Sequence, residues 1–317
     1  MPEVITFGEP LILLAPELPG PLRHVDRFRK SVVGAELNFA IGVSRLGLSS
    51  GWFGRVGQDE FGAQVVACLR SEGVDTSRVR FDAEAPTAVM FKEHRGVGEP
   101  RVIYYRKHSA ASRTGPEDLD ELYLRGARLL HVTGITPALS DSCLRAVHEA
   151  VGLARRAGVT VSFDPNIRLK LMGRDRVQEL LLPLVEAADL LLLGLDEGEV
   201  LFGVSGPDEV VAAARARGSR VVAVKLGDEG AIASDGTVTV RRRALAVPKV
   251  VDTVGAGDGF DAGFVAGYLR GSPLETCLHM GTVVGGCAVT VMGDYEGYPT
   301  WLEAEQLMGT APPPPPR

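Results

Sequence analysis

Short apolar runs alternate with segments of helical periodicity along most of the chain, and this alternation restricts the possible folds more than any other feature. Residues 190–193 and 221–224 are entirely apolar, which is typical of strands covered on both faces. Residues 141–157 and 178–188 carry apolar residues at helical spacing, and Ser140 stands where a helix N-cap is expected. Strands that alternate with helices across short joints form parallel βαβ units. We therefore expect an α/β fold in which helices cover both faces of a mostly parallel sheet.

Two segments interrupt this alternation. Residues 10–31 contain four prolines and show no helical pattern, and residues 86–108 form two extended runs on either side of Gly96 and Gly98. The second segment predicts a β-hairpin, and we expect both segments to form a small β-sheet beside the core. The core is then expected over residues 1–9, 32–85 and 109–311, and the proline-rich residues 312–317 are expected to form a flexible tail.

The composition of the 317 residues excludes several classes of function. Lysine and arginine number 34 against 40 aspartate and glutamate residues, whereas a nucleic-acid-binding protein carries a basic surplus or a basic stripe. The four cysteines form no Cys-x-x-Cys pair, so we expect reduced thiols in a cytoplasmic protein. The first residues lack the pattern of a signal peptide, and no apolar run reaches the ~18 residues that a membrane span needs. We therefore expect neither nucleic acid nor a membrane as a partner.

The sequence DTVGAGDGF at residues 252–260 is the strongest local signal for chemistry. Its turn at residues 255–257 precedes a helical pattern and so places free backbone N–H groups at a helix N-terminus, where an anion such as phosphate binds. Asp258 falls in the first helical turn and is suited to act as a general base toward an attacking hydroxyl, although taken alone it is better explained as an N-cap residue. Phe260 breaks the GxGxxG dinucleotide fingerprint, and the Walker sequence GxxxxGK[ST] does not occur in the chain.

A second glycine-containing turn enters a helical pattern near the N-terminus. Gly34 and Ala35 precede Asn38, whose amide in the first helical turn is suited to hydrogen bonding with a polyhydroxyl ligand. Taken by itself, this segment is better explained as an ordinary joint between a loop and a helix.

Together, the two segments resemble a known family. Residues 34–57 and 252–265 match, in composition and spacing, the two signature patterns of the ribokinase-like (PfkB) sugar kinases, and the resemblance covers nearly the whole chain. It implies a three-layer α/β/α core with a small β lid over the sugar site, and transfer of the γ-phosphate of ATP to a sugar hydroxyl. By this resemblance Asp258 corresponds to the catalytic base. The backbone N–H groups of Gly255, Ala256, Gly257 and Asp258 correspond to the anion hole.

The resemblance also implies a nucleotide site and a magnesium ion. Besides the anion hole, the residues expected to contact ATP are Asn166, Arg168, Lys225, Leu226, Gly227, Asp228, Glu229 and Gly230. Lys225 is suited to reach the phosphates, or else it is a surface charge at the end of a strand. Mg²⁺ is expected to be held mainly by phosphate oxygens and waters. Glu197 is expected to order a metal-bound water, and Gly194 replaces the asparagine of the family's Asn-x-x-Glu motif.

The arginines of two segments indicate an acidic substrate. Strand alternation places Tyr104 and Arg106 on one face of the hairpin, and Arg168 follows a strand at the edge of the sheet where open α/β folds bind ligands. Two arginines directed at one pocket suit a carboxylate, whereas a neutral sugar needs no such pair. Alternatively, Arg106 forms an ion pair at the surface.

Three segments resemble the 2-keto-3-deoxygluconate kinases within the family, namely residues 8–10, 104–110 and 293–297. In this subgroup Asp294 corresponds to an aspartate that contacts the substrate, and Met90 stands where a tyrosine can occur. The residues expected to bind the sugar acid are Gly34, Ala35, Asn38, Met90, Tyr104, Tyr105, Arg106, Arg168, Asp258 and Asp294.

The resemblance implies that ATP and 2-keto-3-deoxygluconate react to give 2-keto-3-deoxy-6-phosphogluconate and ADP, with Asp258 as the general base. Fructokinase or ribokinase specificity on the same fold is the first alternative, and a non-catalytic sugar-binding regulator is the second. An exposed edge of the lid is expected to join copies of the chain in a homo-oligomer. His131 and His279 lie in apolar contexts and are expected to be packed residues without a catalytic role.

Overall fold

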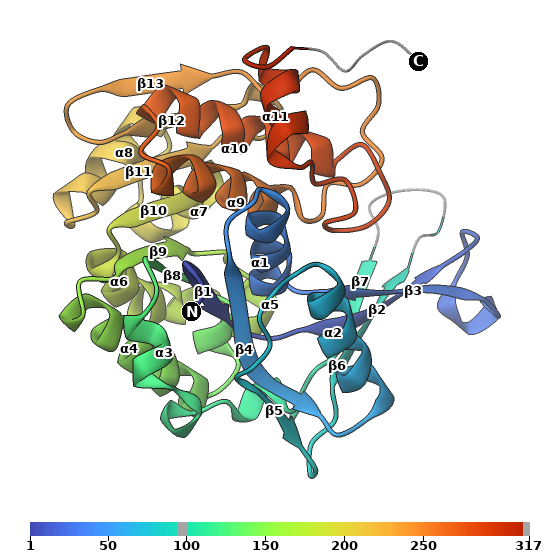
Figure 1. Ribbon diagram of the computed structural model, residues 1–317. Helices are drawn as coiled ribbons and strands as arrows, with labels where there is room; N and C mark the ends of the chain where they lie inside the picture. Colours follow the sequence, from blue (N-terminus) through green and yellow to red (C-terminus); the bar gives the residue numbers. More distant parts are fainter. Residues whose placement is uncertain (94, 96–100, 313–317) are drawn as a thin grey trace.

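A nine-stranded sheet forms the centre of the structure, a computed structural model that describes residues 1–93, 95 and 101–312 (Figure 1). Its strands are β1 (Val4–Phe7), β4 (Ser50–Gly57), β5 (Val79–Asp82), β8 (Leu129–Thr133), β9 (Thr160–Asp164), β10 (Leu190–Gly194), β11 (Val221–Lys225), β12 (Ala231–Ser234) and β13 (Thr239–Arg242). Their order is β13-β12-β11-β10-β9-β8-β1-β4-β5. The strands from β11 to β5 pair in parallel, and β12 and β13 continue the sheet antiparallel at one edge. The expected mostly parallel sheet is confirmed.

Helices cover both faces of this sheet, which confirms the three layers. On β10, Leu190 and Leu192 pack into the core on one face, and Leu191 and Leu193 pack into the core on the other. A strand covered on both faces must be apolar at every position, and this explains the uninterrupted leucine run. The first face carries α1 (Ala35–Arg45), α2 (Glu60–Ser71), α9 (Ala256–Leu269), α10 (Leu274–Ala288) and α11 (Trp301–Met308). The second face carries α3 (Glu121–Arg125), α4 (Asp141–Arg156), α5 (Leu169–Met172), α6 (Val177–Ala187), α7 (Leu195–Phe202) and α8 (Pro207–Ala216).

The ends of α4 and α6 fall within one residue of the expected positions. The hydroxyl of Ser140 accepts a hydrogen bond from the N–H of Cys143 at 3.1 Å, so Ser140 is the N-cap that the sequence indicates. Among the described helices, none is both long and apolar enough to cross a membrane.

A second, four-stranded sheet projects from the core (Figure 1) and is formed by the two segments that interrupt the alternation. Its order is β3 (Phe28–Val33), β2 (Leu11–Pro16), β6 (Ala88–Glu93) and β7 (Arg101–Tyr105). β6 and β7 pair antiparallel, which confirms the predicted hairpin. β3 continues to Val33, past the boundary expected at residue 31. The turn glycines Gly96 and Gly98, and residues 313–317 of the tail, lie outside the described residues.

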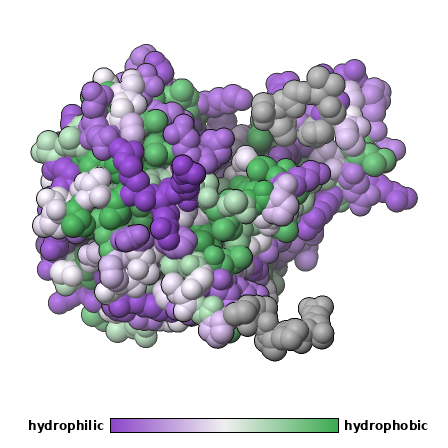
Figure 2. Space-filling view, turned by 90° about the horizontal axis from the view of Figure 1, so that it is seen from above, coloured by the Kyte–Doolittle hydropathy of each residue, from purple (hydrophilic) through white to green (hydrophobic). Residues whose placement is uncertain are grey.

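Viewed from above, apolar residues gather between the main body of the molecule and the part that projects from it (Figure 2). The two sheets also share a hydrophobic cluster: Ile12 on β2 and Val32 on β3 belong to the same core as Leu37 on α1. The small sheet therefore packs onto the first helical layer, and these apolar contacts hold it in place together with its connecting segments.

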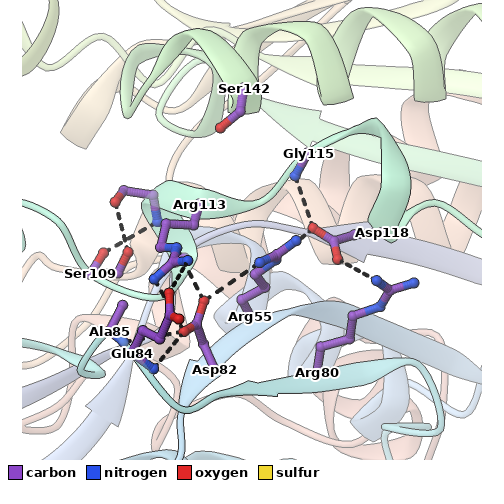
Figure 3. A network of polar contacts seen from close by, with 12 residues as sticks. Arg55, Arg80, Asp82, Glu84, Ala85, Ser109, Arg113, Gly115, Asp118 and Ser142 are labelled. Atoms are coloured by element: carbon purple, nitrogen blue, oxygen red, sulfur yellow. Dashed lines mark hydrogen bonds and ion pairs between the residues drawn. The ribbon is translucent and has the colours of Figure 1, made fainter.

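A network of charged side chains joins β4 and β5 to the segment that follows the hairpin (Figure 3). Arg55 on β4 forms ion pairs with Asp118 at 2.7 Å and with Asp82 at 3.5 Å. The buried Asp118 carboxylate also accepts a hydrogen bond from the N–H of Gly115 at 2.9 Å. Partnered charges of this kind fix the path by which the chain returns from the small sheet to the core.

Candidate active site

A cavity of about 650 Å³ opens where the parallel strands of the large sheet end. Asp164 at the end of β9, Gly194 at the end of β10 and Lys225 at the end of β11 line it. The first turns of α1 and α9 also line it, as do Met90 and Tyr104 of the small sheet. Open α/β sheets bind ligands at this edge because the strand-to-helix connections and helix N-termini converge there.

A second cavity of about 840 Å³ adjoins the first, and Lys225, Thr253 and Gly257 line both. Four of the residues expected to bind nucleotide line this second cavity: Gly227, Asp228, Glu229 and Gly230. Leu226 packs against the hydrophobic core and lines neither cavity, so its side chain is not part of this surface. Residues 243–247 and 285–286 also line it. The sequence analysis missed them because they form no motif and, apart from Arg243, carry small or apolar side chains.

α9 begins at the junction of the two cavities. Gly255 is its N-cap, with a φ of 79° that favours glycine. The N–H groups of Gly257 and Asp258 have no acceptor in the part of the chain that the structure describes, as expected for the first turn of a helix. The N–H of Ala256 differs, because it faces the carbonyl of Thr253 at 3.4 Å. Two donors and the positive end of the helix dipole therefore make this junction suited to an anion.

The carboxylate of Asp258 faces the first cavity. It accepts hydrogen bonds from the side-chain amides of Asn38 at 2.8 Å and Asn166 at 3.5 Å. Desolvation by the surrounding protein, together with the negative charges of Asp164 and Asp294, raises the pKa of Asp258 to about 7. Because Gly255 is the N-cap, the explanation of Asp258 as a capping residue is wrong. A carboxylate that titrates near neutral pH can accept a proton from a bound hydroxyl group.

Asn38 on α1 connects two carboxylates that are distant in sequence. Its amide nitrogen also donates to Asp294 at 3.3 Å, and burial raises the pKa of Asp294 to about 6. The Asn38 side-chain oxygen is buried and has no partner among the described residues. It remains available to accept a hydrogen bond from a ligand, as the sequence analysis expects for a polyhydroxyl compound.

Arg106 lines the first cavity, and its guanidinium already has a partner within the protein. It forms an ion pair with Glu9, whose buried carboxylate also accepts a hydrogen bond from the hydroxyl of Ser109 at 2.9 Å. Burial raises the pKa of Glu9, and the neighbouring Arg106 opposes this rise. The Tyr104 ring lies 5.0 Å from the Arg106 guanidinium carbon. The alternative of a surface ion pair is therefore wrong, because the pair is part of the cavity wall.

Strand alternation separates the two neighbouring tyrosines of β7. Tyr104 pairs with Met90 across the hairpin, and both line the cavity. Tyr105 lies on the opposite face, is 68% exposed and contacts the edge of Phe91. The structure thus does not bring Tyr105 to the cavity, and its inclusion among the substrate-binding residues is wrong, as the period-2 alternation of a strand already implies.

Lys225 is held by two buried aspartates. Its ammonium lies 3.0 Å from Asp164 and 3.2 Å from Asp261, so it is neither a surface charge nor a free phosphate ligand. These carboxylates raise the pKa of Lys225, although burial opposes them. The sequence analysis gave neither aspartate a role. Two signals were available: Asp164 ends a buried strand, and Asp261 follows Asp258 by three residues on one helix face.

Glu197 lines the first cavity, and its carboxylate also accepts hydrogen bonds from nearby backbone N–H groups. Its two carboxylate oxygens accept hydrogen bonds at 2.7 Å from the N–H groups of Gly194 and Ile167. Burial raises the pKa of Glu197 to about 7. No cluster of three His, Cys, Asp or Glu residues suited to a metal occurs in the described ranges. This donor set fits an ion held mostly by phosphate and water better than one held by the protein alone.

Four of the remaining expected residues line the first cavity, and the two histidines do not. Gly34, Ala35, Asn166 and Arg168 all line the first cavity, and Arg168 forms no ion pair within the described residues. His131 is packed as expected, with its ring stacked on Phe39 at 3.8 Å, whereas His279 is half-buried and lies beside Arg242. Burial lowers the pKa of His131 to about 3.

Comparison with known proteins agrees with this geometry. The family model "pfkB family carbohydrate kinase" matches residues 1–301. The chain belongs to the pfkB family of carbohydrate kinases. It is 39% identical to the 2-dehydro-3-deoxygluconokinase of Bacillus subtilis, over 94% of this chain and 93% of the relative, and 42% identical to that of Thermoproteus tenax, over 97% and 94%. A structure named ribokinase II from E. coli, in complex with ATP and Mg²⁺, matches with a TM-score of 0.91 and 26% identity, over 98% of this chain and 100% of that one.

The raised pKa of Asp258 predicts how its replacement changes stability. The folded protein holds this proton up to a pKa of about 7, whereas the ordinary value is 3.8, so folding takes up a proton between these pH values and stability falls as pH rises. Asp258→Asn removes the cost of the buried charge. We expect the variant to exceed the wild type by about 4 kcal/mol in free energy of unfolding at pH 8 and to match it to within about 1 kcal/mol near pH ~4, as measured by urea unfolding. Equal stability at pH 8 would contradict this account.

Proposed function

We propose that this carbohydrate kinase transfers the γ-phosphate of ATP to the 6-hydroxyl of 2-keto-3-deoxygluconate. One observation carries the proposal: the Asp258 carboxylate and the free N–H groups at the start of α9 meet at the junction of two cavities. The two relatives named 2-dehydro-3-deoxygluconokinase, another name for the same activity, support the choice of substrate.

The transfer needs one base and one site for the migrating charge. Asp258 takes the proton of the 6-hydroxyl as its oxygen attacks the γ-phosphorus. The bond from this phosphorus to the β–γ bridging oxygen breaks, and its electron pair leaves with ADP. The N–H groups of Gly257 and Asp258 donate to the equatorial phosphoryl oxygens, which carry most of the negative charge during transfer.

ATP fits the second cavity, with its base beside residues 243–247 and its phosphates directed at α9. The E. coli ribokinase II structure with ATP and Mg²⁺ supports this nucleotide and this ion for the family fold. When bound, Mg²⁺ would neutralise phosphate charge. Glu197 would hold one of its waters while keeping its two backbone hydrogen bonds.

The sugar acid fits the first cavity. Arg168, which lacks an ion-pair partner among the described residues, is the group best suited to the substrate carboxylate. Arg106 keeps its Nε unpartnered in the described structure and can add a second donor without leaving Glu9. Asn38 and Asp294 line the same cavity and are the groups proposed to hydrogen-bond the sugar hydroxyls.

The assembly expected through the small sheet stays a prediction. β3 and β7 are the edge strands of that sheet, and unpaired edges favour pairing with a second chain. Tyr105 on β7 is exposed and supplies apolar surface for such a contact.

Loss of the base should abolish turnover without loss of binding. We expect Asp258→Asn to lower kcat by about 10³-fold, with similar Kd values for ATP and sugar acid, in an ADP-release assay and by calorimetry. In the wild type, kcat/KM should rise with pH through about 7, because Asp258 must lose its proton to act as a base. Binding of both ligands without turnover by the wild type would instead support a sugar-binding regulator.

The carboxylate assignment predicts a selective effect at Arg168. Arg168→Met should raise the KM for 2-keto-3-deoxygluconate by about 10- to 100-fold, since it removes a charge-assisted contact, and should leave the KM for fructose or ribose almost unchanged. Arg101→Met is the matched control, because Arg101 is exposed on β7 and does not line the cavity. Equal losses for acidic and neutral sugars would refute the assignment, and a wild type that prefers fructose or ribose would refute the proposed substrate.

A further inference from the structure

Tyr298 lies outside both signature segments, and its ring occupies a slot made by two glycines. A Cβ atom on Gly259 of α9 would lie 2.6 Å from this ring, and one on Gly42 of α1 would lie 3.2 Å from it. Tyr298 itself is only 4% exposed. Two helices therefore carry glycine where they face one aromatic side chain, so the ring has one position between them.

The hydroxyl of Tyr298 lies at the N-terminus of α9. It donates a hydrogen bond at 2.5 Å to the carbonyl of Gly255, the N-cap of the helix. The same carbonyl accepts the N–H of Gly259 at 2.9 Å, so both of its acceptor positions are used. Burial and the nearby Asp258 raise the pKa of Tyr298 far above its ordinary value, so the hydroxyl keeps its proton and stays a donor.

Gly255 needs a restraint from outside the helix. Its φ of 79° is a conformation that glycine enters and leaves easily, and its carbonyl belongs to the peptide that leads into Ala256. Rotation of that peptide would break the hydrogen bond from the N–H of Gly259 to the Gly255 carbonyl and so loosen the first helical turn, which carries the N–H groups of Gly257 and Asp258. The carbonyl of Asp294 also packs against Gly255, close enough to exclude a Cβ atom. Residues 294–298 therefore hold Gly255 through two separate contacts.

The segment that carries Tyr298 is itself anchored to α1. Arg45 donates hydrogen bonds to the carbonyls of Tyr295 at 2.8 Å and Tyr298 at 3.1 Å, while its Nε pairs with Glu72 at 2.8 Å. Hydrogen bonds thus join the segment that follows α10 to α1 through Arg45 and to the N-cap of α9 through Tyr298.

We propose that Tyr298 is a positioning residue, whose hydroxyl fixes the peptide at Gly255 so that the N–H groups of Gly257 and Asp258 face the phosphoryl group during transfer. This inference rests on the proposed function, because it assigns Tyr298 a role in that same reaction. Tyr298 contacts neither substrate in this account and acts only through the backbone of α9.

Tyr298→Phe tests this role because it removes one oxygen atom and keeps the ring in its slot. The Gly255 carbonyl keeps its bond from Gly259, so the variant leaves no unpaired buried group and is expected to fold. Tyr295→Phe is the matched control: it makes the same change in the same segment, but the hydroxyl that it removes faces the sulfur of Cys68 on α2 at 3.1 Å and not the Gly255 carbonyl.

We expect Tyr298→Phe to lower kcat by about 10- to 100-fold, while the KM for the sugar acid and the Kd for ADP change less than about twofold. Affinity for ADP with aluminium fluoride and sugar acid, which mimics the transferring phosphoryl group, should fall by the same factor as kcat. Tyr295→Phe should retain wild-type kcat. The melting temperatures of the two variants, measured by calorimetry, should be similar.

Two outcomes would overturn the inference: a kcat for Tyr298→Phe equal to that of Tyr295→Phe, or a loss of ADP affinity as large as the loss of kcat. The first would mean that the hydroxyl does not act on the reaction, and the second that it acts on ground-state binding. Failure of the proposed function would look different, because the wild type itself would then form no ADP with any sugar acid.

Discussion

The Asp258 carboxylate lies in the first turn of α9, and the shorter of its two side-chain hydrogen bonds comes from the amide of Asn38 in the first turn of α1. The hydrogen bond between them joins α1 to α9, and the same amide reaches Asp294 from the segment after α10. Close packing of the two helices makes this contact possible, because a Cβ atom on Gly42 would lie only 2.7 Å from the Cβ of Ala262. The polar site therefore depends on small residues in the hydrophobic layer behind it.

The parallel sheet explains why the charges collect at one edge. β9 and β11 end at the same edge, which brings Asp164 to Lys225, and α9 adds Asp261 to this pair. Lys225 also borders both cavities. Its charge is compensated within the protein before any phosphate arrives, whereas the N–H groups of Gly257 and Asp258 at the junction of the cavities are still free to bind a phosphoryl group.

Much of the fold could be predicted from the sequence because local patterns specify it. The apolar run at 190–193 indicates a strand covered on both faces, and the Gly-Ala-Gly turn indicates the start of α9. Contacts between distant segments could not be predicted in this way. Arg106 directly follows β7, whereas its partner Glu9 lies between β1 and β2, and no local pattern reveals which buried carboxylate a given arginine will meet. The proposed role of Tyr298 could not be predicted either, because it depends on one hydrogen bond to a distant backbone carbonyl, which no sequence motif indicates.

The central claim is that the first turn of α9 holds the phosphoryl group while Asp258 accepts the proton of the sugar hydroxyl. A crystal structure with ADP, aluminium fluoride and 2-keto-3-deoxygluconate tests it most directly. The account predicts that the fluoride complex lies within hydrogen-bonding distance of the N–H groups of Gly257 and Asp258, with the 6-hydroxyl oxygen between the aluminium and the Asp258 carboxylate. A fluoride complex bound away from α9, or a 6-hydroxyl that contacts another base, would contradict it.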